Sequence, residues 1–182
     1  MLGRSTSPAE FESAAMPHLN DIFRTAVNLL RDRTEAEDLT QEVYYQAWKS
    51  FHRFEPGTNC RAWLFRILFN RMHHQRRKWF QLRTAKEPEI FEETLAYEPP
   101  VPDTIRDADI LAALRDIPPD YREVVLLADV EEFAYKEIAS LLDIPVGTVM
   151  SRLSRGRKAL RQRLGAVAGE FGLKVRAEGQ GQ

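Results

Sequence analysis

Cysteine, long apolar runs and a net excess of charge are all scarce in this sequence. Cys60 is the single cysteine among 182 residues, so no disulfide can form within the chain. No apolar run is long enough to span a bilayer, and the N-terminal stretch MLGRSTSPAEFESAAMPHLN lacks the apolar core and cleavage site of a secretory signal. We therefore expect a cytoplasmic protein without membrane insertion.

Side chains that hold metals or perform catalysis are also sparse. His73 and His74 have no nearby cysteine or acidic ligand, which makes them a poor metal site. No cluster of histidine, cysteine or carboxylate residues has catalytic spacing. We expect no metal, no cofactor and no enzymatic activity, and we interpret Cys60 as a small, partly buried residue rather than a redox sensor.

The charges that are present are strongly segregated. The net charge of -1 argues against a protein that coats nucleic acid indiscriminately. However, residues 61–86 contain eight Lys or Arg and no acid, whereas residues 87–109 contain eight Asp or Glu and one Arg. Such blocks suggest DNA-facing surfaces separated by an acidic connector.

The first part of the chain shows helical periodicity in two segments. One runs from His18 to Arg31, and the other starts near Thr34 and continues through LTQEVYYQAWKSF. Thr34 and Glu37 have the spacing of a capping box, so we predict that Thr34 caps the second helix. Residues 1–17 carry little pattern and are expected to be a frayed lead-in. The predicted apolar side of the second helix consists of Leu39, Val43, Ala47 and Phe51.

A third predicted helix, from about Arg61 to Lys78, is apolar on one side and cationic on the other. A loop at residues 54–59 precedes it, and Thr58 or Asn59 is suited to cap it. Cations, an amide and an indole together suit single-stranded nucleic acid, although a core position for Trp63 is an equally open alternative. The apolar side comprises Leu64, Phe65, Leu68 and Met72, and the opposite side comprises Arg66, Asn70, His73 and Arg77.

The chain loses helical periodicity between residues 86 and 103, where four prolines and many acids predict a linker. Helical pattern resumes near Thr104, stops at Pro118, and returns from about Asp120 to Asp129. No segment shows the alternation of a strand. The predicted fold is therefore all-α, with two small helical domains joined by a flexible acidic linker.

Residues 135–164 have the pattern of a helix, a tight turn and a second helix. The second helix has an apolar stripe formed by Val149, Leu153, Gly156, Leu160 and Leu164, and an opposite polar side formed by Ser151, Ser154, Arg155, Lys158 and Gln162. Residues 144–169 contain six Lys or Arg and no acid. A charged helix face is often simply solvated, but the turn spacing and the absence of acids favour DNA binding.

Three blocks of sequence, in this order, resemble the extracytoplasmic-function (ECF) group of bacterial RNA polymerase sigma factors. They are DLTQEVYYQAW from Asp38, NCRAWLFRILFN from Asn59 and FAYKEIASLLDIPVGTVMSRLSRGRKALR from Phe133. Together they cover most of the chain. The resemblance implies a lead-in at 1–17, sigma region 2 at 18–80, a linker at 81–103, a region 4 helix-turn-helix at 104–165 and a C-terminal tail at 166–182.

The resemblance also implies roles for individual residues. It places Asp38, Gln41, Glu42, Tyr45 and Trp48 at the clamp helices of the largest subunit of core RNA polymerase. It places Asn59, Trp63, Arg66, Asn70, His73 and Arg77 at the minus-ten element, where Asn70 captures a flipped base. It places Thr148, Ser151, Arg152, Ser154, Arg155 and Lys158 at the minus-thirty-five element, with Arg152 and Lys158 on phosphates. Met150 departs from the arginine common in the family, and Ser154 from a bulkier residue.

The function implied by the resemblance is that of an alternative sigma factor. Such a protein binds core RNA polymerase, double-stranded upstream DNA and the melted non-template strand downstream, under the control of an anti-sigma factor. The chain looks most like the branch controlled by zinc-containing anti-sigma factors in oxidative stress. Two other classes compete with this interpretation. A stand-alone repressor or activator would not need two DNA-facing surfaces, and an enzyme would need a catalytic cluster.

Overall fold

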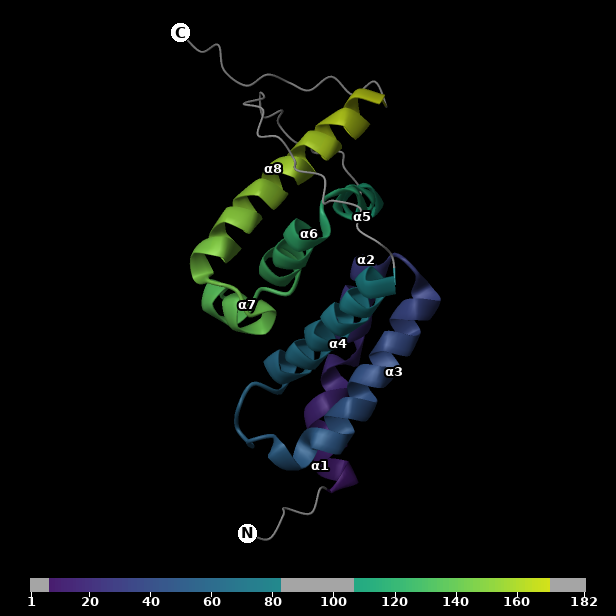
Figure 1. The fold of residues 1–182 in the computed structure, drawn as a ribbon, viewed down its shortest axis with the longest axis vertical. Coiled ribbons are helices and arrows are strands. Elements are labelled where there is room, and N and C mark those ends of the chain that lie inside the picture. Colours follow the sequence, from purple (N-terminus) through teal and green to yellow (C-terminus); the bar gives the residue numbers. More distant parts are fainter. Residues whose placement is uncertain (1–6, 83–106, 171–182) are drawn as a thin grey trace. The chain divides into compact units, whose positions relative to one another are not determined.

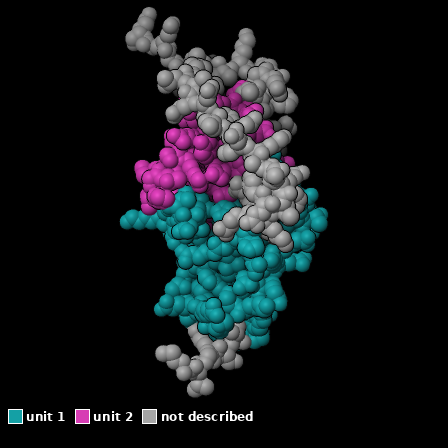
Figure 2. All heavy atoms as spheres, in the orientation of Figure 1, with its two compact units in different colours: residues 1–87, 136–144 teal, residues 88–135, 145–182 magenta. Residues whose placement is uncertain are grey.

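The computed structural model describes residues 7–82 and 107–170, and within these ranges every regular element is a helix (Figure 1). The chain divides into two compact units, residues 1–87 with 136–144 and residues 88–135 with 145–182 (Figure 2). The predicted all-α fold is confirmed. Most of the predicted linker and of the C-terminal tail lies outside the described residues.

The first unit is built on three long helices that pack along one another. Helix α3 packs against both α2 and α4 (Figure 1). Buried apolar side chains from all three helices, such as Ile22, Val43 and Leu68, form its core. Apolar residues recurring every three or four positions produce these one-sided helices, because that spacing places them on one face. The elements are α1 (Pro8–Ala15), η1 (Met16–His18), α2 (Leu19–Leu30), α3 (Arg33–Ser50), η2 (Phe51–Arg53) and α4 (Cys60–Leu82).

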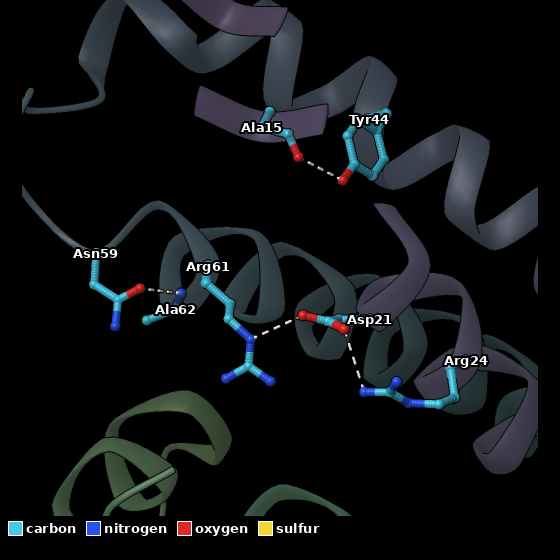
Figure 3. A network of polar contacts seen from close by, with 7 residues as sticks. All are labelled: Ala15, Asp21, Arg24, Tyr44, Asn59, Arg61 and Ala62. Atoms are coloured by element: carbon cyan, nitrogen blue, oxygen red, sulfur yellow. Dashed lines mark hydrogen bonds and ion pairs between the residues drawn. The ribbon is translucent and has the colours of Figure 1, made fainter. Parts of the chain in front are cut away.

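Helix α1 corrects the prediction of a frayed lead-in over residues 1–17. Its Phe11 is buried, with ring centroids 5.3 Å from Trp48 and 5.2 Å from Phe51 in edge-to-face contacts. The hydroxyl of Tyr44 donates a hydrogen bond of 2.9 Å to the carbonyl of Ala15 (Figure 3). The helix was not predicted because its few apolar residues form no repeating pattern, and their burial depends on α3.

Helix α3 begins one residue earlier than the predicted capping residue. Asp32 is the N-cap, and its carboxylate accepts a 2.9 Å hydrogen bond from the amide of Glu35. Thr34 therefore lies inside the helix, and the predicted capping box is wrong. Both residue types can cap a helix, but the preceding Arg31 adopts a left-handed φ of 65° that ends α2 and leaves Asp32 extended. Leu39, Val43 and Ala47 are buried as predicted.

Helix α4 begins at Cys60, directly after Asn59, which is one of the two capping residues predicted from the sequence. The side-chain oxygen of Asn59 accepts a 3.0 Å hydrogen bond from the amide of Ala62, which caps the helix (Figure 3). Arg61 then donates to Asp21 of α2 at 3.2 Å, so the first turn of α4 is held to the neighbouring helix. The predicted apolar side is confirmed, since Leu64, Phe65, Leu68 and Met72 are all buried.

The second half of the chain consists of shorter helices followed by one long helix. The elements are α5 (Asp107–Asp116), α6 (Pro119–Val125), η3 (Leu126–Val130, a π-helical turn), α7 (Tyr135–Leu142) and α8 (Val146–Glu170). The predicted break at Pro118 is confirmed, because α5 ends before it and α6 starts after it. Asp143, with a left-handed φ of 54°, follows α7, and α8 begins three residues later.

Two features hold the second unit together that the sequence pattern did not reveal. The buried guanidinium of Arg122 on α6 donates to the carbonyls of Leu114, Arg115 and Ile117 at 2.8 to 3.0 Å, which satisfies the C-terminal end of α5. Helix α8 packs on α6 at Gly156, where an added Cβ atom would lie 2.7 Å from the side chain of Val125. Gly156 thus permits a close approach of the two helices.

Candidate nucleic-acid interface

Helix α8 exposes the polar side that its sequence predicted. Ser151, Ser154 and Arg155 are exposed, whereas Val149, Leu153 and Gly156 on the other side are buried. Thr148 and Lys158 are half-buried at the margins of the exposed side. The apolar side of α8 packs within its unit. The opposite side carries hydroxyl and guanidinium groups, which are the groups that hydrogen-bond base edges and phosphates in protein–DNA complexes.

Two arginines of α8 are already engaged within the second unit. Arg152, predicted to contact phosphate, donates to the carboxylate of Asp120 on α6 at 2.9 Å. Arg157 donates through Nε to Asp129 of η3 at 3.1 Å, and a second nitrogen reaches the other carboxylate oxygen. This bidentate hydrogen bond to Asp129 is the main reason why the pKa of Arg157 is raised. Sequence reasoning missed both acids, which lie 32 and 28 positions from their partners.

Helix α4 presents a second polar surface in the first unit. Arg66 and Asn70 are exposed, and His73 is half-buried with its ring near that of Phe69. Arg77 lies outside the residues whose side chains are described. Asn59 serves as the helix cap through its side-chain oxygen. The structure therefore places Arg66 and Asn70 together on the exposed side of α4, one helical turn apart.

Trp63 belongs to an aromatic cluster rather than to the open surface. Its ring centroid lies 5.1 Å from that of Phe54 and 6.2 Å from that of Phe51, and the side chain is half-buried. Phe51 in turn stacks on Phe54. The sequence left open whether Trp63 lies in the core or on the surface. In the structure one part of its indole packs against the neighbouring rings, and another part remains exposed to solvent.

A cavity of about 340 Å³ lies between α1 and the loop that precedes α4. Its walls combine aromatic rings with a few polar groups, among them Glu10, Ser13 and His52. Cys60 also lines the cavity, and burial raises the pKa of its thiol, so the neutral form is favoured. The sequence analysis missed this cavity because part of its wall, formed by Glu10, Ser13 and Ala14, comes from α1, which was not predicted.

Helix α3 carries a partly aromatic exposed surface. Asp38 and Gln41 are exposed, as are Tyr45 (59%) and Trp48 (39%). Lys49 lies over the ring of Tyr45 at 4.6 Å. Large exposed rings on a helix are a feature of protein interfaces.

Glu42 on α3 differs from its neighbours because it is bound to α4. Its carboxylate accepts a hydrogen bond of 2.9 Å from Arg71, which also donates to Gln46 at 2.8 Å. The same arginine therefore links two positions of the exposed α3 surface to the helix that carries Asn70.

Within the described residues, no helix is long and apolar enough to cross a membrane, and no group of three or more His, Cys, Asp or Glu residues could hold a metal ion. The surfaces on α4 and α8 instead define an all-helical protein with two polar, cation-bearing helix faces. Polar, cation-bearing helix faces of this kind have the chemistry of a nucleic-acid-binding protein.

Comparison with known families shows what the two segments that carry these helix faces are similar to. Residues 15–80 match Sigma-70 region 2, and residues 107–160 match Sigma-70 region 4. The chain is 34% identical to the ECF RNA polymerase sigma factor SigE of Mycolicibacterium smegmatis over 180 residues, covering 92% of this chain and 70% of SigE. It is 32% identical to EcfG of Rhodopseudomonas palustris over 148 residues, covering 81% of this chain and 79% of EcfG.

A solved structure agrees with the sequence comparisons. The sigma factor RpoE of Bartonella quintana, in complex with the anti-sigma factor NepR, superposes with a TM-score of 0.69 at 31% identity, covering 85% of this chain and 96% of RpoE. The chain belongs to the ECF group of RNA polymerase sigma factors. The family predicted from the sequence is confirmed.

Proposed function

We propose that this sigma factor divides its task among three surfaces: α3 binds core RNA polymerase, α4 with its preceding loop binds the melted minus-ten element, and α8 reads the minus-thirty-five element. One observation carries this proposal. Both cation-bearing helix faces have apolar backs and lie in the two segments that match sigma regions 2 and 4. The bond-forming chemistry then belongs to the polymerase, and this chain supplies no catalytic residue.

The polymerase-binding surface would consist of the exposed part of α3. Tyr45 and Trp48 supply exposed aromatic area, and Asp38 and Gln41 supply polar groups at its margin. Glu42 would act from a position fixed by Arg71. Aromatic anchors bordered by polar residues are typical of binding hot spots, so Tyr45 and Trp48 would carry most of the affinity for the clamp helices.

The minus-ten surface would combine Asn70 and Arg66 with the cavity beside the loop. Extruding a base from the duplex costs a few kcal/mol of stacking and pairing. An exposed amide can hydrogen-bond the edge of an unpaired base, and Arg66 can hold a neighbouring phosphate. The cavity is lined by aromatic rings and gives the loop at residues 54–60 a space in which an unstacked base fits.

The minus-thirty-five surface would be the exposed side of α8. Ser151 and Arg155 lie one turn apart and would face base edges in the major groove, with Lys158 nearest a phosphate. Met150 is 55% exposed where many family members have arginine, so this position would favour an apolar contact, such as that with a thymine methyl group.

Control by an anti-sigma factor is part of the proposal. The Bartonella relative, which is 31% identical, was solved in complex with its anti-sigma factor. An inhibitor of this kind would work in the cytoplasm by covering the polymerase-binding surface. A zinc-containing partner would place redox sensing outside this chain, in keeping with the neutral thiol of Cys60.

Reconstitution with core bacterial RNA polymerase on promoter DNA tests the proposal directly. We expect transcripts from a defined start site only when this protein is present. Promoter binding by the isolated chain that is as tight as binding with polymerase would instead favour a stand-alone regulator. Two variants separate the surfaces: Asn70→Ala should impair promoter opening more than polymerase binding, whereas Tyr45→Ala should weaken polymerase binding and leave promoter opening unchanged in the holoenzyme that does form. Equal loss of both steps in either variant would contradict the division of roles.

The α8 surface has a matched control on the same helix. Arg155→Ala should weaken binding of a duplex that carries the upstream element, because its guanidinium reaches a base edge. Arg163→Ala removes another exposed arginine that lies about 80° further around the helix. If both variants have the same effect, or Arg155→Ala has none, the assigned face is wrong.

A further inference from the structure

The two paired arginines of α8 lie on opposite flanks of its proposed DNA-reading side. Taking Ser151 as the centre of that side, helical geometry puts Arg155 about 40° away, Arg152 about 100° away and Arg157 about 120° away in the other direction. A helix in the major groove is bordered by a phosphate backbone on each side. The flanking arginines are thus the side chains placed to reach those phosphates.

Each flanking arginine is bound to an aspartate of its own unit. The Arg152–Asp120 contact is 2.9 Å, with 26% and 49% of the two side chains exposed. Arg157 and Asp129 meet through two hydrogen bonds, with 44% and 34% exposed. Because all four side chains are accessible to solvent, phosphate oxygens and carboxylates can compete for the same guanidinium groups.

Such competition lowers the part of DNA binding that does not depend on sequence. Attraction between cations and phosphates is independent of sequence, and it supplies nearly all of the affinity for non-specific DNA. A carboxylate that occupies an arginine lowers that attraction and also repels the phosphate. The loss falls on specific and non-specific complexes alike, so a larger share of the remaining binding free energy comes from the base contacts of Ser151 and Arg155.

We propose that Asp120 and Asp129 limit the sequence-independent affinity of α8 for DNA, because they hold Arg152 and Arg157 back from the DNA phosphates. The inference rests on the proposed function of α8 as the minus-thirty-five reader. Both aspartates belong to the segment formed by α6 and η3, to which the proposed function assigns no contact with DNA bases. The second unit thereby limits how strongly its own recognition helix binds DNA of any sequence.

The test uses holoenzyme reconstituted from core polymerase and the full-length chain. Binding is measured to a promoter duplex and to the same duplex with a scrambled upstream element, over a range of salt concentrations. Asp120→Asn and Asp129→Asn keep the side-chain shape but remove the charge. We expect each variant to bind both duplexes several-fold more tightly, because the released cation reaches a phosphate in either complex. The slope of log K against log salt should steepen by about 0.9 for each additional phosphate that the variant neutralises.

Two controls separate this effect from a change in overall charge or in folding. Asp116→Asn makes the same charge change at an exposed aspartate near the end of α5, and it should leave the affinities for both duplexes and the salt slope unchanged. Replacing Arg152 by Gln in the Asp120→Asn chain should abolish the increase in affinity, because the released cation is then missing. A purely structural role for Asp120 would not be reversed by that second change.

Three results would overturn the inference: unchanged binding of both duplexes by both variants, weaker binding to both duplexes, or an increase in affinity that persists without Arg152. Arg155→Ala in the same assay distinguishes this failure from failure of the proposed function. If Arg155→Ala weakens promoter binding while the aspartate variants change nothing, α8 reads DNA but the acids do not tune it. If Arg155→Ala also changes nothing, the assignment of α8 fails first.

Discussion

Replacing Gly156 by alanine perturbs the closest approach between helices α6 and α8. The added Cβ would lie 2.7 Å from a methyl carbon of Val125 and 3.3 Å from both the Cβ and the carbonyl oxygen of Tyr121. Carbon atoms in contact prefer separations of about 3.5 to 4.0 Å. Val125 is buried and β-branched, so it cannot rotate away without a new clash. The helices would have to move apart.

The magnitude follows from two opposing effects. Overpacking a core position typically costs about 1 to 3 kcal/mol. Alanine in place of glycine inside a helix stabilises the helix by about 1 kcal/mol, because alanine has the higher helix propensity. Because the 2.7 Å approach is to a buried, β-branched side chain, we take the upper end of the overpacking cost, and we expect Gly156→Ala to lower the unfolding free energy of the second unit by about 2 kcal/mol.

Gly147 provides the matched control on the same helix. A Cβ there meets nothing within 4 Å, so Gly147→Ala should stabilise the unit by up to about 1 kcal/mol. The two variants make the same chemical change and should shift stability in opposite directions.

Urea unfolding followed by two probes measures the effect. Trp48, Trp63 and Trp79 all lie in the first unit, so tryptophan fluorescence follows that unit, while circular dichroism follows the helices of both. Gly156→Ala should move the midpoint seen by circular dichroism and leave the fluorescence midpoint in place. A Gly156→Ala chain that is as stable as the wild type, or more so, would refute the argument that close helix packing requires glycine there.

Three further predictions concern the first unit. Asp32→Ala should lower its stability by about 1 kcal/mol, seen as an earlier fluorescence transition in urea, because an amide of α3 loses its cap; an unchanged midpoint would argue against the cap. Phe11→Ala should cost about 3 kcal/mol by the same measurement if α1 is part of the core, and almost nothing if α1 is a frayed end. Cys60 should react with iodoacetamide more slowly at pH 8 in the folded chain than in urea, because burial raises its thiol pKa above the ordinary value of 9.0. Since the folded state favours the protonated thiol, this group's stabilising contribution is complete below pH 9 and is lost as the pH rises through the raised pKa; equal folded and unfolded reaction rates would contradict this.

The sequence predicted those parts of the fold that are governed by local periodicity. Helix α8 could be assigned, together with its exposed side, because Val149 and Leu153 repeat at helical spacing whatever they pack against. Helix α1 could not, because Phe11 becomes a core residue only through rings supplied by α3 and the η2 turn that follows it. The start of α3 was misplaced because Asp32 and Thr34 have similar capping chemistry, and only the backbone conformation decides between them.

The candidate site was predicted in part for the same reason. The sequence could indicate which side of α8 is polar, but not that Arg152 is paired with an acid 32 positions away. Nor could it indicate the cavity beside the loop at residues 54–60, whose second wall is α1. Contacts between distant segments are set by the packing of helices, and no local pattern encodes them.

The link from Arg71 to Glu42 and Gln46 also bears on how this protein can evolve. A lineage that altered residue 42 to suit a changed polymerase would leave Arg71 without one of its acceptors, right beside Asn70 on α4. Substitutions at positions 42, 46 and 71 are therefore expected to occur together among close relatives. If the proposed roles of α3 and α4 hold, drift in promoter preference and drift in polymerase contact would then be correlated, even though the two surfaces would bind different molecules.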